Sequence, residues 1–289
     1  MTTSASKNFA VTRDDIITMA LRKIGVNDAA DVVPAAELAA AALSLNTLVK
    51  EWTGEGLALW LRQTVVLFLQ SGQQKYSLGP GGNYCVPQTA IAFGTLSAAA
   101  SAGATSVTVT SWTDYAGNAI SQATTGYALV RLDSGAMSQE TLSASSATTA
   151  TISALDGAAA AGARVYLFTA ASIITRPVRV LTAYRLDNSG KSAEVELISR
   201  TDYEQMSRKN ASGVPTMLHF DPQLDAAQVL VWPVVNDAST DQLVMVVEYY
   251  PDDFDAAGNN PQFPIEWANA LVWNLAMEMS FEYGVDYKT

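Results

Sequence analysis

Cysteine and histidine are almost absent from the 289-residue sequence, which holds one of each, Cys85 and His219. No disulfide can form within one chain, so a stapled secreted scaffold is excluded. A structural zinc site needs four Cys or His ligands and a catalytic zinc site usually three, so carboxylates would have to supply most of any metal site. We therefore expect no bound metal and no cofactor.

Long hydrophobic runs are also missing. The longest, at 57–61 and 65–69, are far too short to cross a bilayer. The first ten residues contain one Lys and no apolar segment, unlike a secretory signal peptide. These features predict a soluble protein made in a reducing cytoplasm.

Basic residues are outnumbered, because 17 Lys and Arg stand against 28 Asp and Glu, for a formal net charge of -11. Residues 237–289 hold ten of the acids and a single base, Lys288, whereas the rest of the chain is close to neutral. A broad nucleic-acid-binding face requires clustered Lys and Arg, so the composition argues against one. The candidates for an acidic surface in this segment are Asp252, Asp253, Asp255 and Glu266.

Residue patterns that carry catalysis are lacking. His219 lies in an apparent strand, and the sequence contains no Gly-x-Ser-x-Gly nucleophile motif. Cys85 has no basic neighbour in the sequence that would lower its pKa. Asp252-Asp253-Phe254-Asp255 is similar to the start of a calcium loop, but Phe263 stands where an EF-hand needs its last acid. We expect a structural His, an inert thiol, a solvated acidic loop and no enzymatic activity.

Three segments are predicted to be long helices. Thr12 is the expected N-cap of the first, with Asp15 as its capping-box acid. Pro34 is expected at the first position of the second helix, whose apolar residues step by four and three as in a two-helix seam. Pro264 opens the third helix and Gly284 ends it.

Strand patterns fill the sequence between the helices. Ser71-Gly72 predicts a hairpin of strands 64–69 and 74–78. Later strands are expected at 177–186, 193–198, 215–220, 228–232 and 243–250, with a short helix at 201–206. Residues 94–170 are rich in Ser, Thr, Ala and Gly, contain no Lys, and show short strand patterns at 106–110, 127–132, 150–152 and 165–169.

These patterns predict an α+β fold. An N-terminal helical hairpin and a C-terminal helix would pack with an antiparallel β-sandwich or barrel. We expect residues 1–92 and 171–289 to form this core, and residues 93–170 to form an inserted small all-β domain.

Several short segments occur in an order that resembles the order of similar segments in a known protein family. In the first part of the chain they are Thr12-Arg13-Asp14-Asp15-Ile16-Ile17, Leu21-Arg22-Lys23-Ile24-Gly25-Val26, Leu45-Asn46-Thr47-Leu48, Trp52, Gly54-Glu55-Gly56-Leu57 and Gly72-Gln73-Gln74-Lys75-Tyr76-Ser77-Leu78-Gly79. In the second part they are Arg176-Pro177-Val178-Arg179-Val180, Pro215-Thr216, Phe220-Asp221-Pro222-Gln223, Trp232-Pro233, Phe263-Pro264-Ile265-Glu266-Trp267-Ala268 and Glu282-Tyr283-Gly284-Val285. Over residues 12–92 and 172–285 the chain resembles phage head-to-tail adaptor proteins. These are the tail accessory factors or packaged-DNA stabilisation proteins, similar in role to tail tubular protein A.

The resemblance implies a structural protein of the virion neck, made in the host cytoplasm. Copies would form a ring, commonly twelvefold, beneath the portal protein, extend the DNA channel, help to retain packaged DNA and hold the next tail or nozzle protein. Double-stranded DNA would pass without sequence-specific binding, because a channel lined by acids repels phosphates. No membrane contact is expected. A ring interface should bury apolar side chains that one copy exposes, and Phe281, Tyr283 and Tyr287 are the candidates.

Two other functions stay open from the sequence. A pair of carboxylates could hydrolyse peptidoglycan, although no spacing among the acids selects a pair. The inserted domain could instead bind a surface glycan by stacking its aromatic residues Trp112, Tyr115, Tyr127 and Tyr166 on a sugar.

Overall fold

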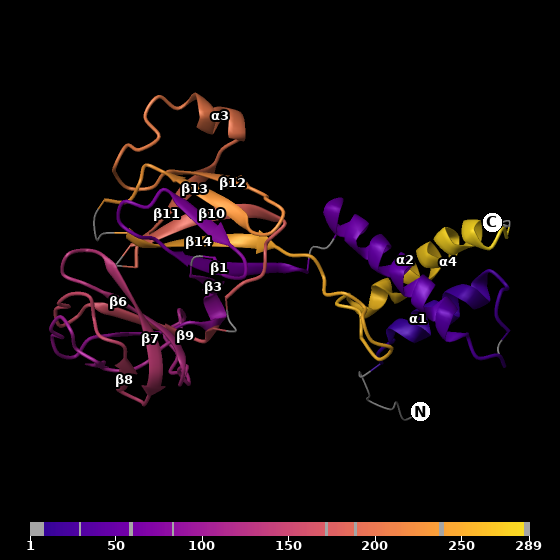
Figure 1. Ribbon diagram of the computed structural model, residues 1–289, viewed down its shortest axis with the longest axis horizontal. Coiled ribbons are helices and arrows are strands. Elements are labelled where there is room, and N and C mark those ends of the chain that lie inside the picture. Colours follow the sequence, from indigo (N-terminus) through magenta and orange to yellow (C-terminus); the bar gives the residue numbers. More distant parts are fainter. Residues whose placement is uncertain are drawn as a thin grey trace, which may run out of the picture. The chain divides into compact units, whose positions relative to one another are not determined.

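The computed structural model describes residues 9–28, 30–57, 60–82, 84–170, 173–187, 190–236 and 240–285. The chain divides into two compact units (Figure 1). Met1–Leu61 and Tyr250–Thr289 form a helical unit, and Arg62–Tyr249 form a β unit. The predicted α+β fold is confirmed, with helices contributed by both ends of the chain.

Three helices build the helical unit: α1 (Arg13–Lys23), α2 (Ala35–Gly54) and α4 (Ala268–Glu282). Buried side chains from all three form one apolar cluster, together with Phe254 of the loop before α4. All described members of this cluster belong to the helical unit. The apolar seam predicted for the second helix therefore packs against other helices.

Local sequence sets where these helices begin. The Asp15 N–H donates to Thr12 Oγ1 (3.3 Å), and Asp15 Oδ2 accepts from the Thr12 N–H (3.0 Å), so the predicted capping box is confirmed. Pro34 is the N-cap of α2 and not its first helical residue, one position from the prediction. After Pro264 the chain first makes a 3₁₀ turn at Ile265–Trp267, so α4 begins later than the sequence suggested.

The β unit contains two sheets. The larger has the strand order β2-β13-β12-β11-β10-β14-β1-β3. Its strands are β1 (Arg62–Phe68), β2 (Lys75–Leu78), β3 (Cys85–Pro87), β10 (Arg179–Asp187), β11 (Ser192–Leu197), β12 (Met217–Asp221), β13 (Ala227–Trp232) and β14 (Thr240–Glu248). Neighbouring strands are antiparallel except for β11 and β12, which are parallel. The connection between these two contains the short helix α3 (Arg200–Gln205), close to its predicted position.

The hairpin predicted at Ser71-Gly72 is wrong. β2 pairs with β13, whereas β1 pairs with β14 and β3, so the two consecutive strands are not partners. Gly72 does lie in a turn with φ of 77°, but its N–H donates to Val235 O (2.7 Å), beyond the end of β13. A turn signal marks where a chain bends. Alternate residues of both strands are buried in one shared core, so β1 and β2 belong to the same sheet without being neighbours in it.

The smaller sheet has the strand order β4-β9-β6-β7-β8-β5 and is antiparallel. Its strands are β4 (Ala92–Thr95), β5 (Ser106–Thr108), β6 (Gly126–Arg131), β7 (Met137–Ser145), β8 (Thr149–Ile152) and β9 (Arg164–Phe168). One of its faces buries a separate apolar cluster. The sheet occupies the segment predicted as an inserted domain, but compactness groups it with the larger sheet, so the boundaries 93–170 stay a prediction.

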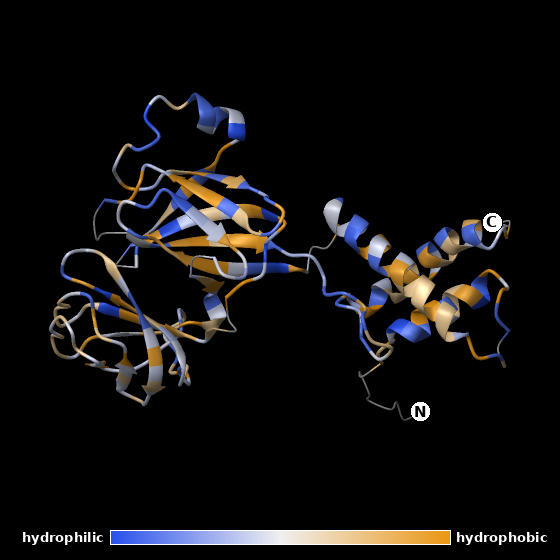
Figure 2. Ribbon diagram, in the orientation of Figure 1, coloured by the Kyte–Doolittle hydropathy of each residue, from blue (hydrophilic) through white to orange (hydrophobic). Residues whose placement is uncertain are grey.

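Aromatic side chains join the two sheets of the β unit. Phe68 of β1 stacks on Phe168 of β9 with ring centroids 5.9 Å apart, and Tyr166 packs 4.9 Å from Phe68. Tyr115 Oη donates to Gln242 Oε1 of β14 (2.9 Å). Figure 2 shows hydrophobic residues along the strands of both sheets and along the helices. None of the helices in the described part of the chain has the length and apolarity of a membrane span.

Candidate functional site

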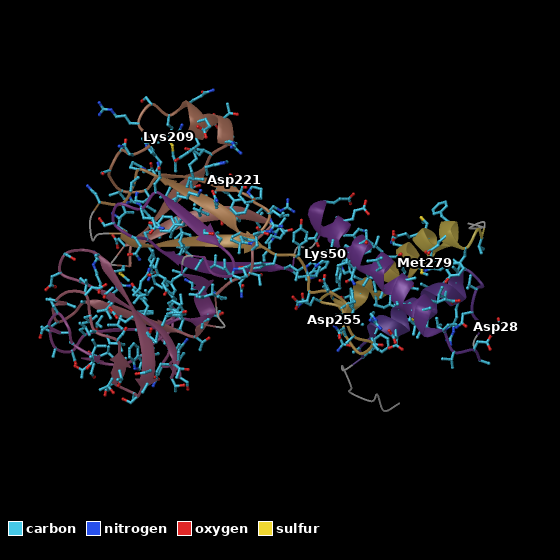
Figure 3. All side chains as sticks on the ribbon, viewed as in Figure 1. Asp28, Lys50, Lys209, Asp221, Asp255 and Met279 are labelled. Atoms are coloured by element: carbon cyan, nitrogen blue, oxygen red, sulfur yellow. The ribbon has the colours of Figure 1, made fainter. Side chains whose placement is uncertain are left out.

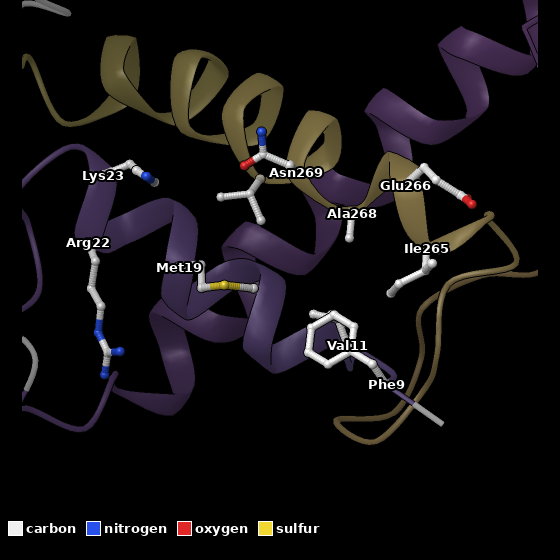
Figure 4. Close-up of a pocket in the computed structure, with 10 residues that line it drawn as sticks. Phe9, Val11, Met19, Arg22, Lys23, Ile265, Glu266, Ala268 and Asn269 are labelled. Atoms are coloured by element: carbon white, nitrogen blue, oxygen red, sulfur yellow. The ribbon is translucent and has the colours of Figure 1, made fainter. Parts of the chain in front are cut away.

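An apolar groove lies on the surface of the helical unit (Figure 4). It has a volume of about 600 Å³ and is lined by the segment before α1, by α1, by the 3₁₀ turn and by the start of α4. Phe9, Val11, Met19, Ile265 and Val272 supply apolar wall. Because Phe9 and Ile265 are exposed while Val11 and Val272 are buried, the groove has an apolar floor and an open apolar rim.

Charged side chains stand at the two ends of this groove. Arg22 and Lys23, from the last turn of α1, lie at one end, and Glu266 lies at the other (Figure 4). Glu266 is exposed and is one of the acids singled out from the sequence. The groove therefore presents positive charge at one end and negative charge at the other.

An exposed ridge continues from the groove along α4. Ile265, Asn269, Trp273, Met277 and Phe281 are spaced by four residues, which places them in one row on a helical surface. All five are exposed, and Phe281 is the most exposed of the four apolar ones, at 83%. Lys23 Nζ lies 4.3 Å from the Trp273 ring centroid, so this ring contacts the basic end of the groove. We call this row the α4 ridge.

The three interface candidates from the sequence have different surroundings. Phe281 is exposed on the α4 ridge, so it is not a core residue. Tyr283 is half-buried against the core of the helical unit. Burial, with smaller contributions from Glu37 and Glu282, raises the pKa of the Tyr283 hydroxyl. Tyr287 lies outside the described residues.

The acids of the predicted acidic loop are exposed, and their carboxylates also form contacts that hold the loop in place. Gln262 Nε2 donates to Asp252 Oδ2 (2.6 Å), and Lys50 Nζ of α2 lies 2.8 Å from Asp253 Oδ1. Lys50 Nζ donates to Pro251 O as well (2.5 Å). Figure 3 labels Lys50 on α2. The loop is thereby tied to itself and to α2.

Asp255, which is labelled in Figure 3, is joined to the same loop by Asn259. Asn259 Nδ2 donates to Asp255 Oδ1 (2.7 Å), and the Phe254 N–H donates to Asn46 Oδ1 of α2 (2.8 Å). The Arg13 N–H, at the start of α1, donates to Asn259 O (2.8 Å). In the described part of the chain, no group of three or more His, Cys, Asp or Glu is placed to hold a metal ion. The loop connects the start of α1 to the middle of α2.

Most of the net negative charge of the chain lies in the helical unit. That unit contains fourteen Asp and Glu against six Lys and Arg, whereas the β unit contains fourteen against eleven. The structure thus adds the acids of the N-terminal helices to those of the C-terminal segment. Burial raises the pKa of the Glu278 carboxyl on α4, and the nearby acids Glu51 and Glu282 raise it further.

Sequence reasoning missed an aromatic cluster at the edge of the helical unit. Trp60 packs 5.0 Å from Phe263 and 5.1 Å from Trp267, and Trp52 of α2 lies 5.9 Å from Trp267. Trp60 Nε1 donates to Gln262 O (2.7 Å). The sequence shows several Trp residues in these segments, but it does not show that their rings contact one another. They come together only when segments far apart in the sequence fold against each other.

A buried ion cluster was missed as well. Glu248, at the end of β14, is fully buried and accepts two hydrogen bonds from the Arg179 guanidinium (3.2 and 3.0 Å). Arg62 Nε, at the start of β1, lies 3.7 Å from Glu248 Oε2. In the sequence, Glu248 is a single acid after the apolar residues of β14, which is only weak evidence for a buried ion cluster. Its partners Arg179 and Arg62 are far from it in the sequence.

The side chains of Cys85 and His219, which were considered for catalysis, are buried and packed against other parts of the β unit. Cys85 is buried, and burial raises the pKa of its thiol. His219 is nearly buried, stacks on Tyr203 (5.9 Å between centroids), and its Nδ1 lies 3.1 Å from Ile198 O. The buried Glu140 of β7 accepts from the hydroxyls of Ser138 and Ser153.

The aromatic residues considered for sugar stacking pack inside the β unit. Trp112 is buried in the core of the smaller sheet, and its Nε1 donates to Ser146 O (2.9 Å). Tyr166 is fully buried, and Tyr115 and Tyr127 pack in the cluster between the two sheets. These rings therefore serve packing.

The helices α1 and α4 thus give the acidic helical unit an apolar groove and an exposed ridge. Comparison of the chain with protein-family models, curated proteins and solved structures finds no match.

Proposed function

We propose that the protein is a structural adaptor of a phage neck, which assembles into a ring beneath the portal protein and connects it to the tail. The observation that carries this proposal is the α4 ridge with its adjoining groove. Exposed apolar side chains gathered beside an apolar groove are typical of protein–protein interaction sites. The order of sequence segments that resemble phage adaptors supports the same function.

The occupant of this surface is a neighbouring copy of the chain. The groove and the α4 ridge would contact a different surface of the next copy, and Arg22, Lys23 and Glu266 at the ends of the groove would face charges of opposite sign there. A contact of this heterologous kind generates a ring when its rotation closes. The portal protein would hold the ring in place and set its number of copies.

The excess of acidic residues in the helical unit fits a ring through which DNA passes. Excess Asp and Glu repel the phosphate backbone, whereas clustered Lys and Arg would bind it and release counterions. Fourteen acids against six bases in this unit would thus let DNA slide past without being held.

Assembly of purified protein with and without portal protein, followed by sedimentation velocity and negative-stain microscopy, tests the proposal. Phe281→Ser with Met277→Ser should abolish the ring, because both side chains are exposed on the α4 ridge and carry little of the core. Leu224→Ser is the matched control, since Leu224 is 89% exposed in the β unit. A chain that stays monomeric and never binds portal protein would refute the function. Ring formation by the ridge variant would refute the proposed contact.

A further inference from the structure

The most exposed apolar side chain of the α4 ridge lies at the opposite end of α4 from the groove. Phe281 is 83% exposed and follows Asn269, which lines the groove, by twelve residues. Because an α-helix rises about 1.5 Å per residue, α4 holds these two positions about 18 Å apart. Phe281 therefore cannot reach the groove of its own copy, whereas the Phe281 of a second copy can.

The groove has the size and the lining to receive a phenylalanine side chain. Its volume of about 600 Å³ lies within the roughly 300–1,000 Å³ of sites that enclose small molecules. Its apolar wall includes Val11, Met19 and Ile265. A methionine side chain adapts to its neighbours, and its sulfur packs favourably against aromatic rings. An aromatic side chain in the groove would thus have apolar contacts on several sides.

Acidic side chains flank Phe281. Glu282 follows it directly, and Glu278 lies three residues earlier, on the same side of the helix. The last turn of α4, all of which the structure describes, contains no Lys or Arg. Acids are unfavourable at the C-terminal end of a helix, where the backbone carbonyls already carry partial negative charge and a cation is stabilising. This end of α4 therefore favours a cation supplied by another part of the protein or by a partner.

One end of the groove presents such a cation. Lys23, in the last turn of α1, is exposed, and its Nζ lies 4.3 Å from the Trp273 ring centroid. This contact orients the ammonium group but does not neutralise its charge. Glu266 lies at the other end of the groove (Figure 4). A phenylalanine that enters at the Lys23 end brings its flanking acids to the ammonium and keeps them away from Glu266.

We propose that Phe281 of one copy occupies the groove of the next copy, with Glu278 and Glu282 beside the Lys23 of that next copy. This contact rests on the proposed ring and names the two surfaces that meet in it. Because the phenylalanine and the groove lie at different ends of α4, a copy that uses one of them still offers the other. Copies therefore add head to tail, which is the heterologous contact that a ring requires.

Disulfide trapping tests this contact on the full chain assembled with portal protein. Asn269→Cys/Glu282→Cys places one thiol on the groove wall and one beside Phe281, and both positions are exposed. Within one copy, α4 holds these positions about 20 Å apart, beyond the roughly 7 Å between Cα atoms that a disulfide can span. The native Cys85 is buried. Oxidation should therefore link different copies and give a ladder of covalent multimers on a non-reducing gel.

Three comparisons make the trapping specific. Leu224→Cys/Glu282→Cys is the matched control, because Leu224 is 89% exposed in the β unit and does not line the groove, and it should give no ladder. Adding Phe281→Ser to the trapping pair should weaken the ladder at least tenfold, since burial of one phenylalanine side chain changes association by roughly ten- to hundredfold. A mixture of the single variants Asn269→Cys and Glu282→Cys should give covalent dimers and nothing larger.

Charge reversal gives a second readout by sedimentation of the assembled chain. Lys23→Glu and Glu282→Lys should each weaken association about two- to fivefold, and the chain that carries both changes should recover it, because the two charges meet between copies. Lys75→Glu, at an exposed position of β2, should leave association unchanged.

The outcomes separate this contact from the ring itself. Rings that form without a ladder and without charge rescue would overturn the contact and leave the proposed function standing. Covalent dimers alone from Asn269→Cys/Glu282→Cys would also overturn it, because they would show that two copies fill each other's grooves. If the unaltered chain forms no ring with portal protein, the proposed function fails and the contact fails with it.

Discussion

The buried ion cluster around Glu248 yields a prediction in which the order of effects matters more than their size. The carboxylate is fully buried, whereas the side chains of Arg179 and Arg62 are 39% and 42% exposed. Replacing Arg179 with Met leaves the buried carboxylate with only the more distant Arg62 at 3.7 Å. Removing one partner of a buried ion pair costs about 3–5 kcal/mol. Because Arg62 still offers partial compensation, we expect the lower end, about 3 kcal/mol.

Replacing Glu248 with Met should cost less. The two arginines that remain can turn to water, since both are already partly exposed, so the loss is close to that of one hydrogen bond to a charged group, about 1.5 kcal/mol. The double variant Arg179→Met/Glu248→Met should be more stable than Arg179→Met alone, because it removes the uncompensated buried charge.

Urea unfolding, read by hydrogen exchange at the amides of β14 and β1, measures these differences within the β unit. Local exchange is preferable to a global signal because the two compact units need not unfold together. If Glu248→Met destabilises as much as Arg179→Met, or if the double variant is the least stable, the reasoning about desolvated charge is wrong.

Three further predictions concern local chemistry. Thr12→Ala should lower the stability of the helical unit by about 1 kcal/mol through loss of the α1 cap, measured by thermal unfolding; no change in Tm would contradict the capping role. Hydrogen bonds from Thr12 lower the pKa of Asp15, so its stabilising effect should be present above the ordinary carboxyl pKa near 4 and be lost as the pH falls through the lowered value. Asp15→Asn should remove that part of the acid dependence, and an unaltered profile would argue against it. Cys85 is buried with a raised pKa, so its thiol should react with a thiol reagent only after unfolding in urea, and rapid reaction of the native protein would contradict the structure.

Features that rest on neighbouring residues were predictable from the sequence. The capping box of α1 joins Thr12 to a residue three positions later, and Gly25, with φ of 74°, follows the C-cap of the helix, where glycine is common. Strands were also expected on both sides of Gly190, and β10 and β11 lie there as an antiparallel pair. In each case the side chains that decide the structure lie within a few residues of one another.

Features that rest on distant residues were not predictable. Ser71-Gly72 marks a turn, but the partner of β2 is β13, about 150 residues later in the chain. β7 was missed because its alternating pattern contains mainly polar residues, and its burial depends on the strands beside it. On α4, apolar residues occur on all sides, so periodicity could not separate buried Met279 from exposed Phe281.

We propose that copies of this chain form a ring through the α4 ridge of the helical unit. A cryo-electron-microscopy reconstruction of the protein assembled on its portal protein tests it most directly. We expect a closed ring in which Trp273, Met277 and Phe281 of each copy are buried against the neighbouring copy, with the acids of the helical unit facing the channel. A ring in which these three side chains remain in solvent, or a particle with a single unassembled copy, would contradict it.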